Sequence, residues 1–78
     1  MAEIRLAEEL WTTSMLPEGC LERWRRRDGE AIEAGAAVAD VRIEDALHTI
    51  TSPASGRLSQ LVEENAVVEP GSVIGAVQ

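Results

Sequence analysis

Short apolar runs bounded by glycine, proline or asparagine recur along the whole chain. Residues 3–6 alternate polar and apolar side chains, as a half-buried strand does. The turn formers recur at intervals too short for helices of ordinary length, which favours an all-β sandwich or flattened barrel. Further strands are expected at residues 20–24, 36–43, 46–51 and 58–62.

The strand pattern also indicates which side chains face the interior. Leu21 and Trp24 are available to the core from one strand, and the next has Ala37, Ala39 and Val41 on one face. Residues 10–15 are expected to form a loop that leads into a turn at Pro17-Glu18-Gly19.

Residues 29–41 and 65–77 are two copies of one unit, 36 positions apart. Gly29 corresponds to Asn65, and these two residue types adopt a positive φ most readily. A duplicated turn and strand predicts two halves related by a pseudo-twofold axis, neither of which closes a core alone. Three positions are identical in the two copies: Glu33/Glu69, Gly35/Gly71 and Val41/Val77.

Glu44 and Asp45 lie between the two copies, and an apolar-bearing arm flanks them on each side. They are expected to form a two-residue hairpin turn, because aspartate tolerates the left-handed backbone that such turns need. A turn on the pseudo-twofold axis would be the most protruding point of the molecule. A group to be presented to another protein would be mounted there.

Composition narrows the class of protein. Seventy-eight residues, 1–78, are expected to form one domain near the lower size limit for a self-sufficient core. The net charge of −7 argues against nucleic acid as a partner. The single cysteine, Cys20, rules out an internal disulfide and fits a reducing compartment. With no signal-peptide pattern and no apolar run near about 18 residues, we expect a cytoplasmic protein without a membrane contact.

All seven basic residues are arginine, so the chain contains no lysine. Lysine is ordinarily among the commonest residues. A GC-rich genome accounts for part of this bias, but it would not normally remove a lysine that the chemistry required.

A set of short motifs recurs in one joint spacing, which is more specific than any single motif: Pro17-Glu18-Gly19, Trp24, Gly29 with Gly35, Ala39-Asp40-Val41, Ser52-Pro53 with Gly56, and Glu69-Pro70-Gly71. In these motifs the chain resembles the lipoyl/biotinyl carrier domains, the swinging-arm modules of 2-oxo acid dehydrogenase complexes and biotin-dependent carboxylases. The resemblance spans residues 3–77. It implies a flattened barrel of two four-stranded sheets related by a twofold, a barrel-sandwich hybrid.

In lipoyl members of this family the hairpin tip reads Asp-Lys-Ala, and the lysine amine carries the cofactor. Counting back from Pro53 without a gap places Glu44, Asp45 and Ala46 on these positions, closer to the lipoyl tip than to the biotinyl Met-Lys-Met. Asp45 thus stands where the family has its acceptor lysine. Lipoate and biotin are attached by their own carboxyl group as an amide, which a carboxylate cannot form.

Nearby groups do not replace the missing amine. The Arg42 guanidinium stays protonated and is not a nucleophile. The α-amino group of Met1 is the remaining primary amine, and the family fold implies that it lies away from the tip. We therefore expect no attached lipoate or biotin, and no cofactor.

Other candidate chemistry has simpler interpretations. Cys20 would carry an acyl group as a thioester if it were reactive, but it is expected to be a small buried hydrophobe. His48 is either a metal ligand or general base, or a strand histidine packed against Val41; we favour the second. With Glu44 and Asp45 it does not make a closed metal site, so no metal is expected.

The basic run and the acidic hairpin tip each have two possible interpretations. Arg23 and residues 25–27 form a basic run flanked by carboxylates, which is expected to be a solvated turn, with a docking patch for an acidic partner as the alternative. The acidic tip, Glu44-Asp45 with Asp40 nearby, is expected to be a solvated hairpin end. Its alternative is recognition by an arginine-rich partner.

No catalytic constellation is present, so we expect no enzyme activity. The leading hypothesis is a lipoyl-like domain without its attachment lysine, monomeric in isolation. It would act as a docking or assembly module for a protein partner, such as a component of a 2-oxo acid dehydrogenase or acyltransferase system. The alternatives are a covalent acyl or carboxyl carrier loaded through an unconventional group such as Cys20, and a structural remnant without a dedicated partner.

Overall fold

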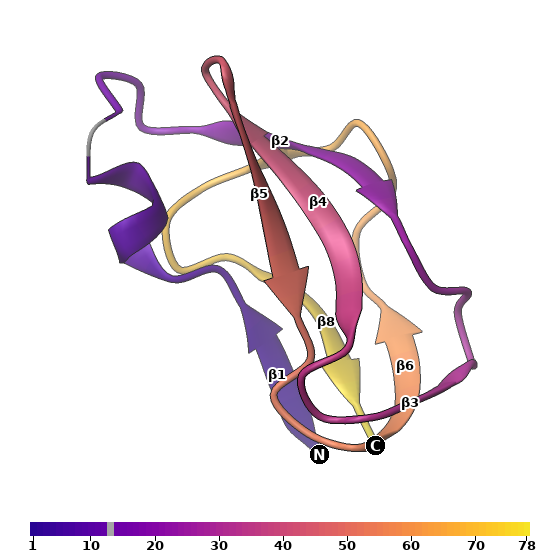
Figure 1. The fold of residues 1–78 in the computed structure, drawn as a ribbon. Coiled ribbons are helices and arrows are strands. Elements are labelled where there is room, and N and C mark those ends of the chain that lie inside the picture. Colours follow the sequence, from indigo (N-terminus) through magenta and orange to yellow (C-terminus); the bar gives the residue numbers. More distant parts are fainter. Residues whose placement is uncertain (13) are drawn as a thin grey trace.

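The computed structural model describes residues 1–12 and 14–78, and within them it contains eight β-strands and one 3-10 helical turn, η1. The predicted all-β class is confirmed, and Figure 1 shows the strands arranged around a common interior. The elements are β1 (Ala2–Arg5), η1 (Glu8–Trp11), β2 (Gly19–Trp24), β3 (Ala31–Ile32), β4 (Ala37–Ile43), β5 (Ala46–Thr51), β6 (Gly56–Gln60), β7 (Val67–Val68) and β8 (Val73–Val77).

The strands form two four-stranded sheets, with the orders β1-β8-β6-β3 and β5-β4-β2-β7. Every pairing in the two sheets is antiparallel. The apolar core lies between the sheets and is built mainly from valine, isoleucine and leucine. Both termini lie at one end of the molecule, and the β4–β5 hairpin projects from the other end (Figure 1). No helix in the described ranges is long and apolar enough to span a membrane.

The predicted internal repeat is confirmed by the backbone. Strands β3 and β4 lie 36 positions before β7 and β8, and each strand matches its counterpart in burial pattern. Gly35 and Gly71 adopt φ values of 87° and 83°, and Gly29 and Asn65 adopt 84° and 72°. The shift that relates the copies also carries β5-β4-β2-β7 onto β1-β8-β6-β3. The two sheets are therefore pseudo-equivalent halves of one barrel.

A β-bulge in β2 explains how Leu21 and Trp24 both contact the core. Alternation along a regular strand would put residues three apart on opposite faces. The register shifts between Leu21 and Arg23, which leaves Glu22 as an extra residue and restores Trp24 to the inner face. Leu21 is fully buried and Trp24 packs against the core, so this prediction is confirmed.

The alternation expected in β4 is only partly correct. Ala39 and Val41 are fully buried, as predicted, but Ala37 is only half-buried. The register shifts between Ala37 and Ala39, so Val38 is buried as well. The next residue, Asp40, is also buried, and it becomes part of the site described below.

The expected strands at 3–6, 20–24 and 36–43 are each displaced by one residue at one or both ends, and two expected segments differ by more. In the expected 10–15 loop, Leu10 and Trp11 belong to η1, and Trp11 is buried with 8% of its surface exposed. Burial of this indole against the core accounts for the local order, and Thr13 of the same stretch lies outside the described residues. Strand β6 begins at Gly56 rather than at residue 58, because Gly56 pairs with Ile32.

Candidate functional site

The candidate site is the tip of the β4–β5 hairpin. Ile43 pairs with Ala46, so Glu44 and Asp45 form the predicted two-residue turn. Both side chains are exposed, as is Ala46. The positive φ falls on Glu44, at 54°, and not on Asp45 as expected from the sequence. Asp45, the expected counterpart of the acceptor lysine, is therefore the less restricted of the two turn residues.

The segment after η1 supports one side of the tip. The backbone N–H of Met15 donates a hydrogen bond of 3.3 Å to Oε1 of Glu44. A shallow hollow of about 300 Å³ lies beside the turn, lined by Leu10 and Ser14 on one side and by Ile43, Glu44, Asp45, Ala46 and His48 on the other. This hollow is open to solvent and lies at the lower end of the size range of ligand pockets, so it is a surface recess.

His48 packs in the strand as the sequence analysis favoured. It pairs with Val41 across the β4–β5 ladder and is half-buried at the edge of the hollow. Within residues 1–12 and 14–78, no group of three or more potential ligands is placed to hold a metal ion.

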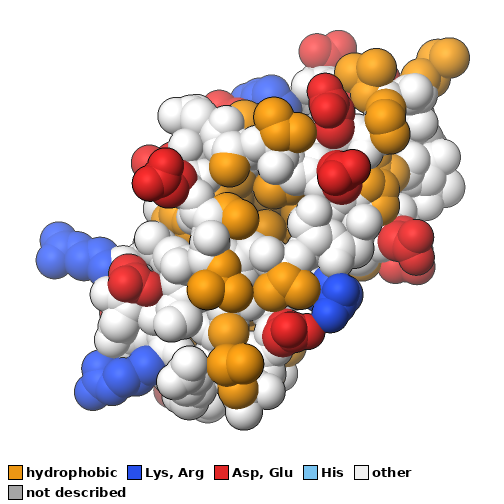
Figure 2. Space-filling model, turned by 180° about the vertical axis from the view of Figure 1, so that it is seen from behind, with side chains coloured by type: hydrophobic (Ala, Val, Ile, Leu, Met, Phe, Trp, Pro, Cys, Tyr) orange, Lys and Arg blue, Asp and Glu red, His pale blue; other side chains and the backbone are white. Residues whose placement is uncertain are grey.

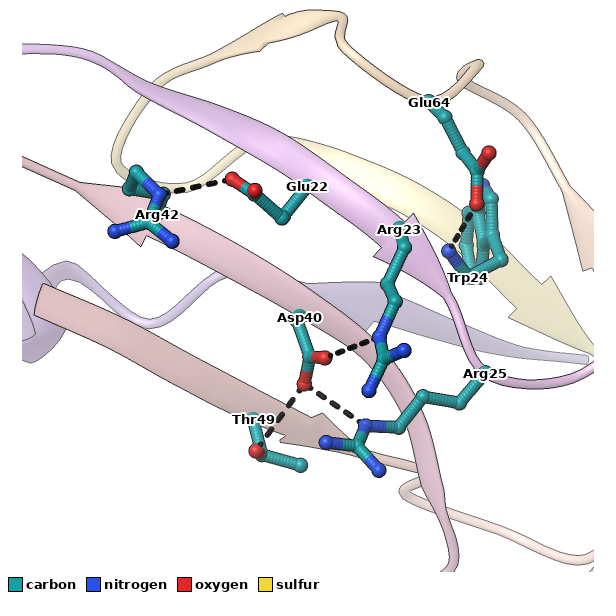
Figure 3. A network of polar contacts seen from close by, with 8 residues as sticks. All are labelled: Glu22, Arg23, Trp24, Arg25, Asp40, Arg42, Thr49 and Glu64. Carbon is teal, nitrogen blue, oxygen red and sulfur yellow. Dashed lines mark hydrogen bonds and ion pairs between the residues drawn. The ribbon is translucent and has the colours of Figure 1, made fainter.

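Asp40 lies on the outer face of the sheet and is nevertheless 1% exposed, because two arginines cover it. Its Oδ2 accepts a hydrogen bond of 2.9 Å from Nε of Arg23, and its Oδ1 accepts one of 2.9 Å from Nε of Arg25. The Thr49 hydroxyl donates a third bond to Oδ1, at 3.2 Å (Figure 3). This carboxylate is therefore satisfied entirely within the molecule.

These contacts set the charge state of Asp40. The hydrogen bond from Arg25 is the main cause that lowers the pKa of the carboxyl, and Arg23 and Thr49 act in the same direction. Burial alone would raise this pKa. The alternative in which Asp40 joins an acidic tip for a partner is wrong, because Asp40 is buried and already paired.

Three of the four arginines in the basic run are paired with carboxylates. Arg23 and Arg25 bind Asp40, and Nη1 of Arg26 lies 3.4 Å from Oε2 of Glu30. The backbone N–H of Arg27 also donates to Glu30, and this bond is the main cause that lowers the pKa of Glu30. On the face seen in Figure 2, blue arginine side chains are interspersed with red carboxylates. The expected solvated turn therefore also stabilises the fold: Arg23 and Arg25 bind Asp40 of β4, and Arg26 and Arg27 bind Glu30 in the turn after β2.

The sequence contains a signal for this cluster that could have predicted it. Asp40 stands among buried apolar residues in β4, and a buried carboxylate needs a cation or several hydrogen-bond donors. Arg23 and Arg25 are two positions apart and therefore project to the same side. Only the bulge at Glu22, however, decides that this side faces Asp40.

A second ion pair lies nearer the tip. Nε of Arg42 is 2.9 Å from Oε2 of Glu22, and both side chains are substantially exposed (Figure 3). The hydrogen bond to Glu22 is the main cause that raises the pKa of Arg42, with a smaller contribution from the charge of Asp45. The charge of Asp45 therefore acts on the Arg42 guanidinium, although the Asp45 side chain is exposed.

Cys20 is only half-buried in β2, and not fully buried as expected. Its thiol lies 3.8 Å from the backbone oxygen of Leu21, and the residue pairs with Arg42 of β4. Cys20 also pairs with Val67 of the edge strand β7, so it lies one strand in from that edge and two strands in from the β5 edge.

The residues at the tip do not fit an amide-linked prosthetic group. The turn offers the carboxylates of Glu44 and Asp45, and its neighbours in the hollow add a hydroxyl and an imidazole. None of these is a primary amine. The α-amino group of Met1 lies with the termini at the end of the molecule opposite the hairpin, as expected (Figure 1).

Comparison with known proteins agrees with this fold. The biotin/lipoyl family model, described as biotin-requiring enzyme, matches residues 13–77. Among solved structures, the chain is similar to the lipoyl domain of the 2-oxoglutarate dehydrogenase complex from Azotobacter vinelandii, with a TM-score of 0.78 and 16% identity over 100% of this chain and 96% of that one. No curated protein sequence matches the chain. With the family match covering most of the chain, the protein belongs to the biotin/lipoyl domain family.

Proposed function

We propose that this protein is a lipoyl-like domain that carries no prosthetic group and acts as a non-catalytic docking or assembly module. The single observation that carries the proposal is Asp45, which lies in the exposed two-residue turn of the β4–β5 hairpin. The chain contains no lysine that would take its place. A carboxylate at the tip cannot form the amide through which lipoate or biotin is held in the family.

The proposed partner is a protein of a 2-oxo acid dehydrogenase or acyltransferase system. The support is the likeness of the whole chain to a lipoyl domain of such a complex. In this proposal the domain is a monomer when isolated, and it occupies the surface that receives a lipoyl domain without delivering a cofactor. The single cysteine and the absence of a disulfide pair favour a cytoplasmic setting.

The experiment is co-expression with a lipoate ligase and, separately, with a biotin ligase, followed by intact-protein mass spectrometry. The expected result is the unmodified mass in both cases. A mass increase equal to either amide would overturn the proposal. An acyl adduct that is released by thiols and lost in Cys20→Ser would instead support the carrier alternative.

The docking half requires a second measurement. Candidate 2-oxo acid dehydrogenase and acyltransferase components from the same organism would be titrated with the labelled domain by isothermal calorimetry. We expect saturable binding to one component, competed by the lipoyl domain that the component normally receives. Absence of binding to all of them would contradict the docking role, whatever the result for the modification.

A further inference from the structure

The four outer strands of the two sheets differ in how well they are protected from pairing with another strand. The orders β1-β8-β6-β3 and β5-β4-β2-β7 leave β1, β3, β5 and β7 at the edges. Strands β3 and β7 have two residues each and are too short to template a further strand. The two longer edges are β1, with four residues, and β5, with six.

The pseudo-twofold makes β1 the matched counterpart of β5. Glu3 pairs with Ala76 and Thr49 pairs with Asp40, and these two partners are 36 positions apart. By the same relation, Arg5 is equivalent to Thr51, through their partners Val73 and Ala37. The edge positions that are charged in β1 are therefore threonines in β5.

The charges of β1 are engaged at its edge. Nη2 of Arg5 lies 2.7 Å from Oε1 of Glu3, and Nη1 donates a bond of 3.1 Å to the oxygen of Gly71. Charged side chains on an edge strand discourage the addition of another strand. Strand β5 has the sequence ALHTIT, with no charged residue, proline or glycine, and its threonines and isoleucine favour the extended conformation.

The backbone of β5 offers alternate groups to the outside. The two-residue turn makes Ala46 and Ile43 a cross-strand pair, and at the far end the Ser52 N–H donates to the Ala36 oxygen at 2.9 Å. The even-numbered residues of β5 therefore direct their backbone N–H and C=O groups to β4. Those of Leu47, Thr49 and Thr51 point away from the sheet. Among the described residues, no backbone hydrogen bond outside the β4 ladder reaches them.

We propose that β5 is a strand-pairing site, at which an extended segment of a partner protein adds antiparallel as a fifth strand of the β5-β4-β2-β7 sheet. The groups of Leu47, Thr49 and Thr51 would supply the backbone hydrogen bonds. Antiparallel addition continues the pattern of a sheet in which every pair is antiparallel. The exposed Leu47 side chain, 49% accessible, adds an apolar contact beside the ladder.

The acidic turn at the start of β5 determines which kind of partner segment fits this edge. Glu44 and Asp45 are exposed at the start of β5, and Arg42, two positions before the turn, is already paired with Glu22. Because the C-terminal end of an antiparallel segment lies beside the start of β5, that end of the partner segment carries arginine or lysine. The residues before it are uncharged and of types that favour the extended conformation.

A second copy of this chain fits less well. Antiparallel pairing of two β5 strands would place the uncharged Ser52 and Pro53 of one copy beside the acidic turn of the other. The turn would gain no cation, and each copy brings a net charge of −7. The occupant is therefore a basic segment of a different protein, and this assignment rests on the proposed docking function.

The test uses the whole protein and the end-blocked peptide TVTVTVRR, followed by amide NMR and hydrogen exchange. In the free protein, the amides of Leu47, Thr49 and Thr51 are expected to exchange quickly and those of His48 and Ile50 slowly. Addition of the peptide should shift the β5 amides and slow exchange at the three outward positions. The control peptides are RRTVTVTV, with the charge at the wrong end, and TVTVTVRR with alternate backbone nitrogens methylated.

Lysine substitutions distinguish a specific effect at the β5 edge from a general effect of added surface charge. Leu47→Lys combined with Thr51→Lys places charge on the β5 edge and should weaken peptide binding at least about tenfold. Val67→Lys makes the same kind of change at a side chain that is 66% exposed on β7, and should leave the affinity within about twofold. The amide spectrum of each variant verifies that it is folded.

Three outcomes would overturn the proposal. They are peptide shifts that lie outside β5, equal binding of the methylated peptide, and protection of the three outward amides by self-association, measured by sedimentation equilibrium without peptide. None of these depends on ligase modification or on the titration of candidate enzymes. A failure of the edge assignment is therefore distinguishable from a failure of the docking function.

Discussion

The Arg23 guanidinium and the Asp40 carboxylate, 17 positions apart in the sequence, meet at 2.9 Å across β2 and β4. Arg25 reaches the other oxygen of the same carboxylate at the same distance. The buried anion is thus held by two cations whose own side chains remain partly in solvent. The arrangement ties the strand after the bulge to the strand that leads to the tip (Figure 3).

Removal of this anion should destabilise the fold. Asp40→Asn deletes the charge that both guanidinium groups contact, and we expect the free energy of unfolding to fall by about 2 kcal/mol. Chemical denaturation monitored by circular dichroism measures this change. The matched control is Glu22→Gln in the exposed pair with Arg42, which should cost much less because solvent screens this pair. Equal costs for the two variants would contradict the role given to Asp40.

Asp40 also predicts how stability depends on pH. Its pKa is lower in the folded protein than in the unfolded chain, so its contribution is present above the unfolded pKa of about 3.9. That contribution is lost as the pH falls through the folded-state pKa. Denaturation midpoints between pH 6 and 2 should therefore fall less steeply for Asp40→Asn than for the wild type. Parallel curves would show that other carboxylates account for the acid sensitivity.

The pseudo-twofold predicts equal costs at equivalent turns. Gly35 and Gly71 have nearly the same positive φ, and a Cβ at either would meet no atom within 4 Å. Gly35→Ala and Gly71→Ala should each lower the free energy of unfolding by about 1 kcal/mol, from backbone conformation alone. Gly75→Ala should cost more, because its Cβ would lie 2.7 Å from the Ser59 oxygen. Thermal denaturation of the three variants provides the comparison.

The alignment of the tip predicts a gain of modification. Asp45→Lys restores an amine at an exposed turn position whose φ is not positive, so stability should change by less than about 0.5 kcal/mol. Co-expression with a lipoate ligase should then add one lipoyl amide, detected by intact mass. Glu44→Lys is the matched control: it moves the lysine by one position and should remain unmodified. Modification of both variants, or of the control alone, would contradict the assignment of Asp45 to the acceptor position.

The Glu44-Asp45 turn was only partly predictable from the sequence. Its length was predictable, because a two-residue link between apolar arms leaves few alternatives. Which residue takes the left-handed conformation was not predictable, since aspartate tolerates it better than glutamate does. The structure places it on Glu44, whose carboxylate accepts a hydrogen bond from Met15 at 3.3 Å. Glu44 therefore adopts a positive φ that glutamate disfavours, and its side chain is at the same time hydrogen-bonded to Met15, 29 positions away.

By itself, the amino-acid sequence determined the all-β class, the two related halves and the acidic two-residue tip. These follow from local properties: alternation along strands, residues that accept a positive φ, and their recurrence after 36 positions. Only the tertiary structure decided that Arg23 and Arg25 cover Asp40, and that β5 is the uncharged edge while its counterpart β1 is protected. The physical reason is that strand register and sheet order depend on contacts between distant segments, and a single bulge at Glu22 changes which side chains meet.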